Sequence, residues 1–552
     1  MPTIDTGQIY LLGPGKREIK PSLIEFHCGS RLPPMPVQPP FAWNQNPFRD
    51  NNWQAQLQMW RPMDAHILAF ASSKNPAWLI EPQKLIMDWH DYYLVNAPSR
   101  YVWADMNVGM RAMKIAWFLA LRNSSPGLLD SKFITVCEAL RKSHLDCLLD
   151  PARQVLSNHA FMDLHGCMAL AQTLPENESD KMRLFIHAQL QKLLTSQFDE
   201  FGIHRENSPQ YQEFVLRYLR RLLASGWFET QKLKDLIAKA ENALAWFRLP
   251  DGRLAPIGDT DYTSPAPHAN KNICFQEEEI FNSSGYVIFR PQKFEDSRDS
   301  YLFFMCARHS LTHKHSDDMS VFWHESEDIL IDSGKYAYQS SPQRLYVKST
   351  RAHNTLEVDY CDEYSRGRPR RPPAPLTLVE KAVKSDDVFI AISHMIIQEH
   401  DLAHRRMVAL KPRSWLLVCD MVFSTRPHDY GLHWHFSPRT QIEITNNGIN
   451  AELFSGRKLF ISLHSSIKTD LNLIAGSDSP RLQGFCSDGY GTIISAPCLS
   501  LTGRSECWQA ATLFSLDKPA LLDRVEMGKY RVTENGKSRV FKASSIFPQT
   551  LF

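Results

Sequence analysis

The sequence lacks a charge excess of either sign. Its 552 residues carry 62 Lys and Arg against 60 Asp and Glu, a formal net charge of +2. Proteins that bind nucleic acid through bulk charge have a strong basic excess, so this composition argues against nucleic acid as a partner. Any anionic ligand would have to bind to a local cluster of basic residues rather than to the surface as a whole.

The sequence also lacks segments that direct a chain to or across a membrane. Residues 1–20 do not combine a basic start with an apolar run of roughly 7–15 residues, the pattern of a secretory signal. No run approaches the roughly 18 apolar residues of a spanning helix. The 11 Cys are odd in number and form no C-x-x-C motif, which favours reduced thiols. We therefore expect no membrane partner and a cytoplasmic protein, or a periplasmic or secreted one if a leader precedes this sequence.

The chain is too long for one ordinary hydrophobic core. At 552 residues it predicts at least two domains. Residues 21–50 are rich in proline and predict an extended arm. From Trp53 to about Trp246, apolar residues spaced three and four apart predict helices, which proline and glycine separate. The predicted helices cover residues 83–95, 105–121, 131–149, 159–174, 180–198, 210–223 and 231–247.

The second half of the sequence changes to a strand pattern. Residues 248–272 are rich in Pro, Gly and Asp and predict a linker. Beyond them, turn residues separate short apolar runs, which is typical of a large antiparallel β-structure. The predicted strands cover residues 285–290, 301–307, 389–393, 407–410, 414–420, 431–436, 441–444 and 458–464. We predict an α+β multidomain chain with an arm at residues 1–50, a helical domain at 51–265 and a β domain at 266–552.

Residues 308–359 carry the densest chemistry of the chain. Polar groups interrupt their apolar runs: the pair His313 and His315, then Asp332, then His353. A strand would place both imidazoles of the pair on one face, and the hairpin predicted after the pair would bring Asp332 back beside them. Two histidines and a carboxylate are ligands that zinc accepts. We predict that some of these groups hold a metal and that at least one faces a substrate.

A single H-x-H pair does not define a metal site. A second pair, His433 and His435 in LHWHF, occurs in this chain of 21 His, so such pairs also arise by chance. The combination of an H-x-H pair, a strand-ending Asp-Ser-Gly and an Ala-His-Asn is far more specific than the pair by itself.

Three places in the helical half also carry candidate chemistry. Asn158 and His159 begin a predicted helix, where the alternative is a helix cap with a bystander histidine. Tyr211 follows E-x-S-P in the first turn of another helix, where the alternative is a proline-started helix with a half-buried tyrosine. Arg111 and Lys114 share one face of a largely apolar helix, where the alternative is pairing with a core carboxylate or plain solvation.

The motifs of residues 308–359 resemble the heparinase II/III-like family of polysaccharide lyases. The matching segments are HKHSDD, IDSG and RAHNT. The resemblance implies an N-terminal incomplete (α/α) toroid followed by a C-terminal antiparallel β-sandwich that holds a structural zinc. It implies His315, Asp332 and His353 as the metal ligands, and it implies that His313 faces the substrate.

The helical half carries further elements of the same resemblance. The family has an Asn-His pair at the start of a helix, which implies that Asn158 binds the substrate carboxylate and that His159 is a base or a carboxylate partner. The segment from Gly202 to Tyr211 is similar to the family's G-x-x-x-E-x-S-P-x-Y element, whose tyrosine is the catalytic phenol. An Arg of the corresponding helix lines the family's substrate groove, which implies this role for Arg111.

The resemblance implies β-elimination on a uronic-acid-containing anionic polysaccharide. The proton next to the sugar carboxylate is weakly acidic, so the site must stabilise an enolate-like dianion. Tyr211 would protonate the leaving oxygen. Tyr211, His159 or His313 would remove the proton, and the configuration of the sugar decides which. We also predict that Glu206 and Arg308 contact the substrate.

Two other functions stay open at the level of sequence. A metal-dependent glycan hydrolase would use a zinc-bound water, and a glycan-binding protein of the same architecture would bind without turnover. The Asn-His and S-P-x-Y elements favour the lyase over the binding protein. Heparan sulfate, hyaluronan or chondroitin, alginate and bacterial capsule glycans all fit the predicted chemistry, with endo or exo action and any oligomeric state.

Overall fold

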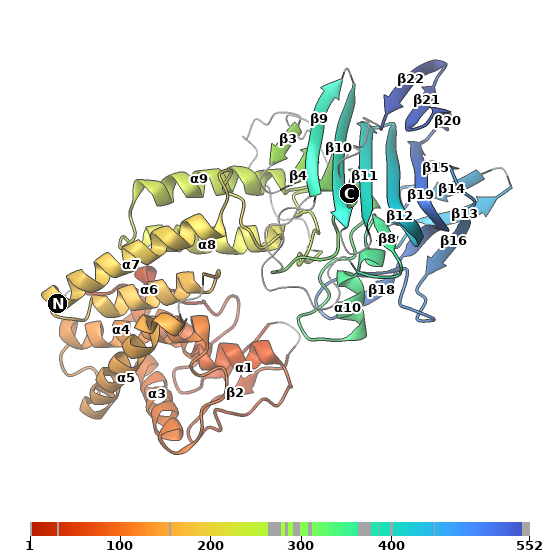
Figure 1. The fold of residues 1–552 in the computed structure, drawn as a ribbon. Coiled ribbons are helices and arrows are strands. Elements are labelled where there is room, and N and C mark those ends of the chain that lie inside the picture. The colour runs from red at the N-terminus through yellow and green to blue at the C-terminus, as the bar shows by residue number, and fades with distance from the viewer. Residues whose placement is uncertain are drawn as a thin grey trace. The chain divides into compact units, whose positions relative to one another are not determined.

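The computed structural model divides the chain into two compact units (Figure 1). The helical unit comprises Met1–Phe198 and Val215–Ala238, and the sheet unit comprises Asp199–Phe214 and Lys239–Phe552. Residues 199–214 and 239–262, which the sequence placed in the helical domain, thus take part in the sheet unit. The structure describes residues 3–29, 32–153, 156–262, 278–281, 285–290, 299–306, 312–362, 377–385, 387–397, 401–446 and 448–543.

The predicted helices are present in the structure, which also has α1 Asn51–Gln58 and α2 Asp64–Ser73 and begins α3 at Ala77 rather than at residue 83. Proline, glycine and capping residues set the bounds; the Asp130 side chain, for example, accepts from the backbone N–H groups of Lys132 and Phe133 and begins the fifth helix at Ser131. The last two helices contribute residues to both units. The elements are η1 Thr6–Gln8, β1 Glu25–Phe26, β2 Met35–Pro36, α1 Asn51–Gln58, η2 Arg61–Met63, α2 Asp64–Ser73, α3 Ala77–Val95, α4 Asp105–Ser124, α5 Ser131–Leu149, η3 Pro151–Arg153, α6 Ala160–Ala171, α7 Glu176–Gln197, α8 Pro209–Ala224 and α9 Gln231–Trp246.

Two glycines permit a close contact between two helices of the helical unit. A Cβ atom on Gly109 of α4 would collide with the backbone of Met162 in α6, and one on Gly166 of α6 would collide with the backbone of Gly109. Only glycine therefore permits this approach of α4 and α6. The contact places the first turn of α6, which follows Asn158 and His159, against a long buried helix.

The sheet unit is almost entirely antiparallel. Its large sheet has the order β13-β14-β15-β19-β12-β11-β10-β9, with β16 paired to β19 and β8 to β12, and its second sheet has the order β3-β4-β5-β6-β7. The elements are β3 Glu278–Phe281, β4 Tyr286–Phe289, β5 Ser300–Met305, β6 Val321–Glu325, β7 Asp328–Leu330, α10 Pro342–Lys348, η4 Thr350–Ala352, β8 Leu356–Val358, β9 Thr377–Ser385, β10 Val388–Ile397, β11 Leu402–Lys411, β12 Trp415–His435, β13 Gln441–Thr445, β14 Gly448–Glu452, β15 Lys458–Ser465, β16 Asp470–Ala475, β17 Phe485–Ser487, β18 Ile493–Ser495, β19 Pro497–Leu516, β20 Leu521–Glu526, β21 Lys529–Glu534 and β22 Lys537–Lys542.

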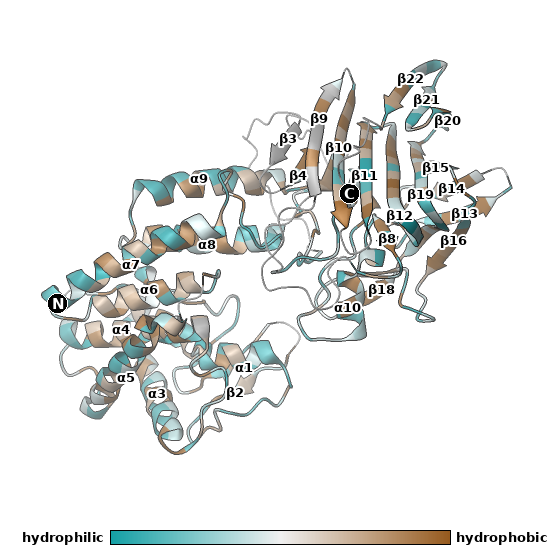
Figure 2. Ribbon diagram, viewed as in Figure 1, coloured by the Kyte–Doolittle hydropathy of each residue, from teal (hydrophilic) through white to brown (hydrophobic). Residues whose placement is uncertain are grey.

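The central strands of the large sheet are buried on both faces. Alternate residues such as Leu302 and Phe304 of β5 pack in one core with Leu416 and Val418 of β12, because side chains two apart lie on the same face of a strand. The opposite face of the large sheet packs against β20–β22 through residues such as Tyr530. Figure 2 accordingly shows hydrophobic residues recurring along the strands of the large sheet.

Two predictions from the sequence are corrected by the fold. Residues 248–262 are not an exposed linker, because Ile257, Asp259 and Thr260 are buried in the sheet unit; residues 263–272 lie outside the described part of the chain. The prediction also missed the 20-residue strand β19, whose central stretch is too polar for a simple apolar run.

None of the helices that the structure describes is long and apolar enough to span a membrane.

Candidate active site and metal centre

Tyr211 and His313 stack on one another within the sheet unit. Their ring centroids lie 3.6 Å apart with the planes tilted by 19°. The Tyr211 hydroxyl also lies 2.6 Å from that of Tyr338, a residue that no sequence motif indicated. The Tyr338 side chain is 47 % exposed, so this group of rings reaches the surface.

The start of α8 positions Tyr211. Pro209 is the first residue of the helix, as expected of a residue that lacks an N–H to satisfy. Ser208 precedes it, and its hydroxyl accepts from the Tyr211 N–H at 3.4 Å and lies 2.9 Å from the Thr260 hydroxyl. The E-x-S-P-x-Y segment therefore attaches the first turn of α8 to buried residues 258–260 of the same unit.

His313 lies in a turn rather than on the predicted strand. Its φ is +56°, a left-handed conformation that no strand residue adopts. The two imidazoles of the pair consequently do not share a strand face. His313 turns toward Tyr211, whereas His315 is fully buried beside His353, with ring centroids 5.4 Å apart.

Asp259 connects the two histidines. One of its carboxylate oxygens lies 2.7 Å from His313 Nδ1, and the other lies 2.9 Å from His315 Nε2. Arg344 of α10 donates to both oxygens in a fork, at 2.6 and 2.9 Å. Burial opposes ionisation of Asp259, but the hydrogen bonds from His313, His315 and Arg344 outweigh it and hold the pKa of the carboxyl well below its usual range.

No motif in the sequence pointed to Asp259. It lies in GDTD, inside the segment predicted as a linker, and no spacing relates it to the histidine motifs more than 50 positions later. Its partners become visible only when the chain has folded.

The ionised Asp259 fixes the tautomers of both imidazoles. A carboxylate only accepts hydrogen bonds, so His313 Nδ1 and His315 Nε2 must each donate. In the neutral rings the lone pair then lies on His313 Nε2 and on His315 Nδ1. His313 Nε2 lies 3.5 Å from a Glu206 carboxylate oxygen, which places the predicted substrate contact Glu206 beside the imidazole.

The phenol of Tyr211 is held in its protonated form. Burial, the neighbouring Tyr338 hydroxyl and the charges of Asp259 and Glu206 all raise the pKa of Tyr211 above its ordinary value. In the resting protein Tyr211 is therefore a hydrogen-bond and proton donor.

The structure brings the three predicted metal ligands together. His315, Asp332 and His353 are buried, and one ligand atom from each lies within 4.8 Å of the others. The β6–β7 hairpin returns Asp332 toward His315, and His353 Nδ1 lies 2.8 Å from an Asp332 oxygen. His315 Nδ1 and His353 Nε2 are buried without a hydrogen-bond partner among the described residues, so each ring has a nitrogen that no described group satisfies.

Asn354 holds the segments of this cluster in register. Its amide nitrogen donates to the carbonyls of Val321 and Ile331, both at 2.8 Å. Its amide oxygen accepts from the backbone N–H of His435 at 2.6 Å, and its own N–H donates to Ser320. The residue after His353 thus joins the start of β6, the residue before Asp332 and the end of β12.

A cation and two aromatic rings lie beside the stacked pair. Lys335 Nζ lies 5.1 Å from the Tyr338 ring and 5.7 Å from the Tyr490 ring, and it also forms an ion pair with Asp261 at 2.6 Å. The two aromatic rings suit the apolar face of a sugar, whereas Lys335 is buried and its charge is already balanced by Asp261.

Asn158 and His159 belong to the helical unit. They precede α6, and His159 is its N-cap residue but makes no side-chain capping hydrogen bond. Asn158 is buried, and His159 is partly exposed. The structure thus places both at the predicted helix start.

Arg111 does not line a surface of the helical unit. Its side chain is 0 % exposed and donates to His144 Nε2 at 3.0 Å and to the Gln58 carbonyl at 2.6 Å. The expected contact with a substrate groove is therefore corrected to a structural role in the helical core. Lys114, on the same helix face, pairs with the buried carboxylate of Asp64 at 2.9 Å. The predicted substrate contact Arg308 lies outside the described residues.

The fold and these sites define a class of protein: a helical N-terminal region joined to antiparallel sheets that carry a buried His-Asp-His cluster. Residues 277–484 match the family model described as heparinase II/III-like, C-terminal, and this segment contains all three cluster residues. Within this segment the chain is therefore similar to the C-terminal domain of the heparinase II/III-like family. A search of curated protein sequences found no match.

Solved structures share the fold over nearly the whole chain. A crystal structure of heparinase III matches with a TM-score of 0.73 at 12 % identity, covering 91 % of this chain and 85 % of that one. Heparan sulfate lyase HepC from Pedobacter heparinus matches with a TM-score of 0.69 at 16 % identity, covering 98 % and 92 %. A heparinase III with methylated lysines matches with a TM-score of 0.70 at 16 % identity, covering 93 % and 87 %. At these identities the likeness shows a common fold.

Proposed function

We propose that the protein is a polysaccharide lyase that cleaves a uronic-acid-containing anionic polysaccharide by β-elimination. The observation that carries this proposal is the stacking of Tyr211 on His313 at 3.6 Å, which brings a protonated phenol and an imidazole of defined tautomer together. One group can donate a proton and the other can accept one, as elimination next to a carboxylate requires.

Each group has a role that its surroundings favour. Tyr211, held as a phenol, protonates the leaving glycosidic oxygen. His313, whose Nδ1 is committed to Asp259, accepts the proton next to the sugar carboxylate at Nε2. Tyr338 packs against the sugar beside them, and Glu206, which only accepts hydrogen bonds, favours the protonated imidazole that results. Depending on the configuration of the sugar, Tyr211 or His159 replaces His313 as base.

Asn158 and His159 keep their predicted role as ligands of the substrate carboxylate. An amide and an imidazole that donate to this carboxylate stabilise the negative charge that develops when the neighbouring proton leaves. We also propose that the helical unit is the incomplete (α/α) toroid, and the sheet unit the antiparallel β-sandwich, that the family resemblance implies.

We propose that His315, Asp332 and His353 hold a zinc ion. The donor set suits zinc, and the buried lone pairs of His315 Nδ1 and His353 Nε2 fit a cation. When bound, the ion would supply structural cohesion to the loop that carries His313. The three ligands are at most 2 % exposed, which disfavours a hydrolase that presents a zinc-bound water to a polymer.

Absorbance of a new carbon–carbon double bond tests the proposal. The protein is incubated with heparan sulfate, the polymer named for one structural relative, and with hyaluronan, chondroitin and alginate. We expect ultraviolet absorbance from unsaturated uronate ends with at least one polymer, and a loss of roughly 10²–10⁴-fold in kcat for Tyr211→Phe. Tyr360→Phe, which alters a 65 % exposed phenol of the same unit, serves as the matched control. New reducing ends without absorbance would establish hydrolysis instead, and binding without either product would establish a glycan-binding protein.

A further inference from the structure

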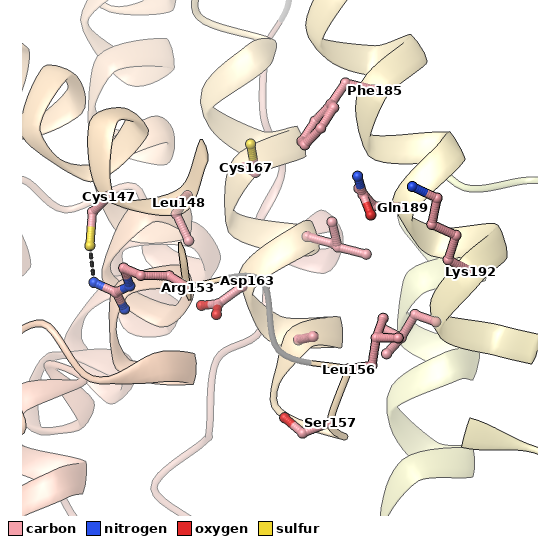
Figure 3. Close-up of a pocket in the computed structure, with 13 residues that line it drawn as sticks. Cys147, Leu148, Arg153, Leu156, Ser157, Asp163, Cys167, Phe185, Gln189 and Lys192 are labelled. Atoms are coloured by element: carbon pink, nitrogen blue, oxygen red, sulfur yellow. Dashed lines mark hydrogen bonds between the residues drawn. The ribbon is translucent and has the colours of Figure 1, made fainter. Parts of the chain in front are cut away.

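A cavity in the helical unit is independent of the residues used above. It has a volume of about 220 Å³ and lies between the end of α5, η3, α6 and α7 (Figure 3). For scale, an apolar cavity of roughly 150 Å³ accepts benzene. The space is therefore sufficient for one ring or a short chain, and too small for an oligosaccharide.

The walls of the cavity are mostly apolar. Leu148 of α5, Leu164 and Cys167 of α6, and Phe185 and Leu193 of α7 line it. Water in such surroundings finds few hydrogen-bond partners, so an apolar group displaces it favourably. A sugar, which carries a hydroxyl on most of its carbons, would lose hydrogen bonds to water that these walls cannot replace.

The polar residues of the cavity carry an excess of positive charge. Arg153 and Lys192 line it against one carboxylate, Asp163, and Asp163 already accepts from the Gly109 N–H at 3.1 Å. Lys192 is exposed, and neither it nor Gln189 makes a hydrogen bond or ion pair with any residue that the structure describes. Two polar side chains at the cavity are thus available to a ligand.

One helix face joins the apolar and the polar part. Phe185, Gln189 and Lys192 are spaced four and three residues apart on α7, so they lie on the same side of the helix. Figure 3 shows the three side chains extending from α7 on the side that faces α6. A ligand that packs its apolar part on Phe185 would bring a group at its other end to Gln189 and Lys192.

We propose that this cavity binds a small amphiphilic carboxylate: an aromatic ring or short alkyl chain inserted between α6 and α7, with its carboxylate paired to Lys192 and hydrogen-bonded to Gln189. The proposal goes beyond the lyase function and does not depend on it. Ser157 and Ala160 also line the cavity, and they flank Asn158 and His159 in sequence. A ligand bound in the cavity would therefore contact residues at the start of α6.

Calorimetric titration of the full chain with 4-phenylbutyrate tests this proposal. We expect saturable one-site binding with a Kd on the order of 1 mM or below, as a ligand of this size allows. The alcohol 4-phenylbutanol should bind about fivefold more weakly and 4-phenylbutylamine at least about tenfold more weakly, because only the carboxylate is attracted to Lys192. Added salt should weaken binding of the carboxylate and leave binding of the alcohol unchanged.

Two variants separate a built site from chance binding. Lys192→Gln should weaken 4-phenylbutyrate about three- to fivefold and leave 4-phenylbutanol unchanged, whereas Lys181→Gln, an exposed control on the same helix, should change neither. Ala160→Phe should fill the space and abolish binding, with its melting temperature recorded to show that the variant is folded. Absence of saturation, equal affinities for acid, alcohol and amine, or unchanged binding by the Lys192 variant would overturn the proposal.

Discussion

The two H-x-H pairs of this chain have the same spacing in the sequence but different geometry in the structure. His433 and His435 lie on β12 with ring centroids 6.4 Å apart, two imidazoles on one strand face, as the spacing predicts. His433 is satisfied inside the protein by Ser500 at 2.9 Å and Glu357 at 3.4 Å. Among the described residues it belongs to no cluster that could hold a metal.

The pair His313 and His315 instead leaves the strand geometry. The left-handed turn at His313 separates the rings, and one carboxylate, Asp259, then fixes each ring from its other side. One imidazole reaches Tyr211 at a partly exposed site, and the other reaches a buried cluster. A straight strand thus gives both histidines one environment, whereas a turn can give them two roles.

The largest expected effect compares the first histidine of each pair. His313→Gln should lower kcat on a cleaved polymer by roughly 10²–10⁴-fold, because the proposed base is removed. His433→Gln should change kcat less than about twofold while costing roughly 1–3 kcal/mol of stability through its buried partners. Steady-state kinetics and urea unfolding measure the two effects, and equal kinetic losses in both variants would remove His313 from the chemistry.

The second comparison concerns the metal. His315→Ala should weaken zinc retention by at least about 100-fold, since an imidazole ligand is lost, whereas His435→Ala should retain zinc like the wild type. Mass spectrometry of the metal after dialysis against a zinc buffer gives the stoichiometry. A chelator should lower the melting temperature of the wild type and leave that of His315→Ala unchanged; zinc-free wild-type protein would contradict the proposed metal site.

Asp259 tests whether the two roles of the first pair are joined. Asp259→Asn should cost roughly 3–5 kcal/mol of stability, because the buried guanidinium of Arg344 loses its counter-charge, and should lower both kcat and zinc retention. Asp420→Asn is the matched control, since the buried Asp420 accepts from His404 and Arg406 in the same unit. It should cost similar stability and leave kcat and zinc retention per folded molecule unchanged. If kcat and zinc retention fall in both variants, Asp259 acts only through the stability of the fold.

The smallest expected effect concerns the second phenol. Tyr338→Phe removes the hydroxyl that lies 2.6 Å from that of Tyr211 and one of the causes that raise the pKa of Tyr211. We expect kcat to fall by about fivefold or less, because the proposed acid remains, and the basic limb of the pH–rate profile to move to lower pH. Wild-type kinetics at all pH values would show that Tyr338 does not influence Tyr211.

The positions of the helices follow from the sequence to a large extent. α5 begins at Ser131 and ends at Leu149, the predicted bounds, because Asp130 is a capping residue and apolar periodicity is a local property. The convergence of His315, Asp332 and His353 was also predicted, since a hairpin and a motif resemblance both pointed to it. Asp259 and Tyr338 could not be predicted, because each acts only through residues distant in sequence.

By itself the sequence determined where most of the helices and several of the strands form, and which residue types are available for proton transfer and metal binding. Periodicity, capping and turn chemistry decide those features over a few neighbouring residues. The tertiary structure alone decided that Arg111 lies in a core, that His313 adopts a left-handed turn and that Asp259 serves two imidazoles. Those outcomes depend on burial and on hydrogen bonds between segments that are distant in sequence. Such interactions form only when the segments have packed together.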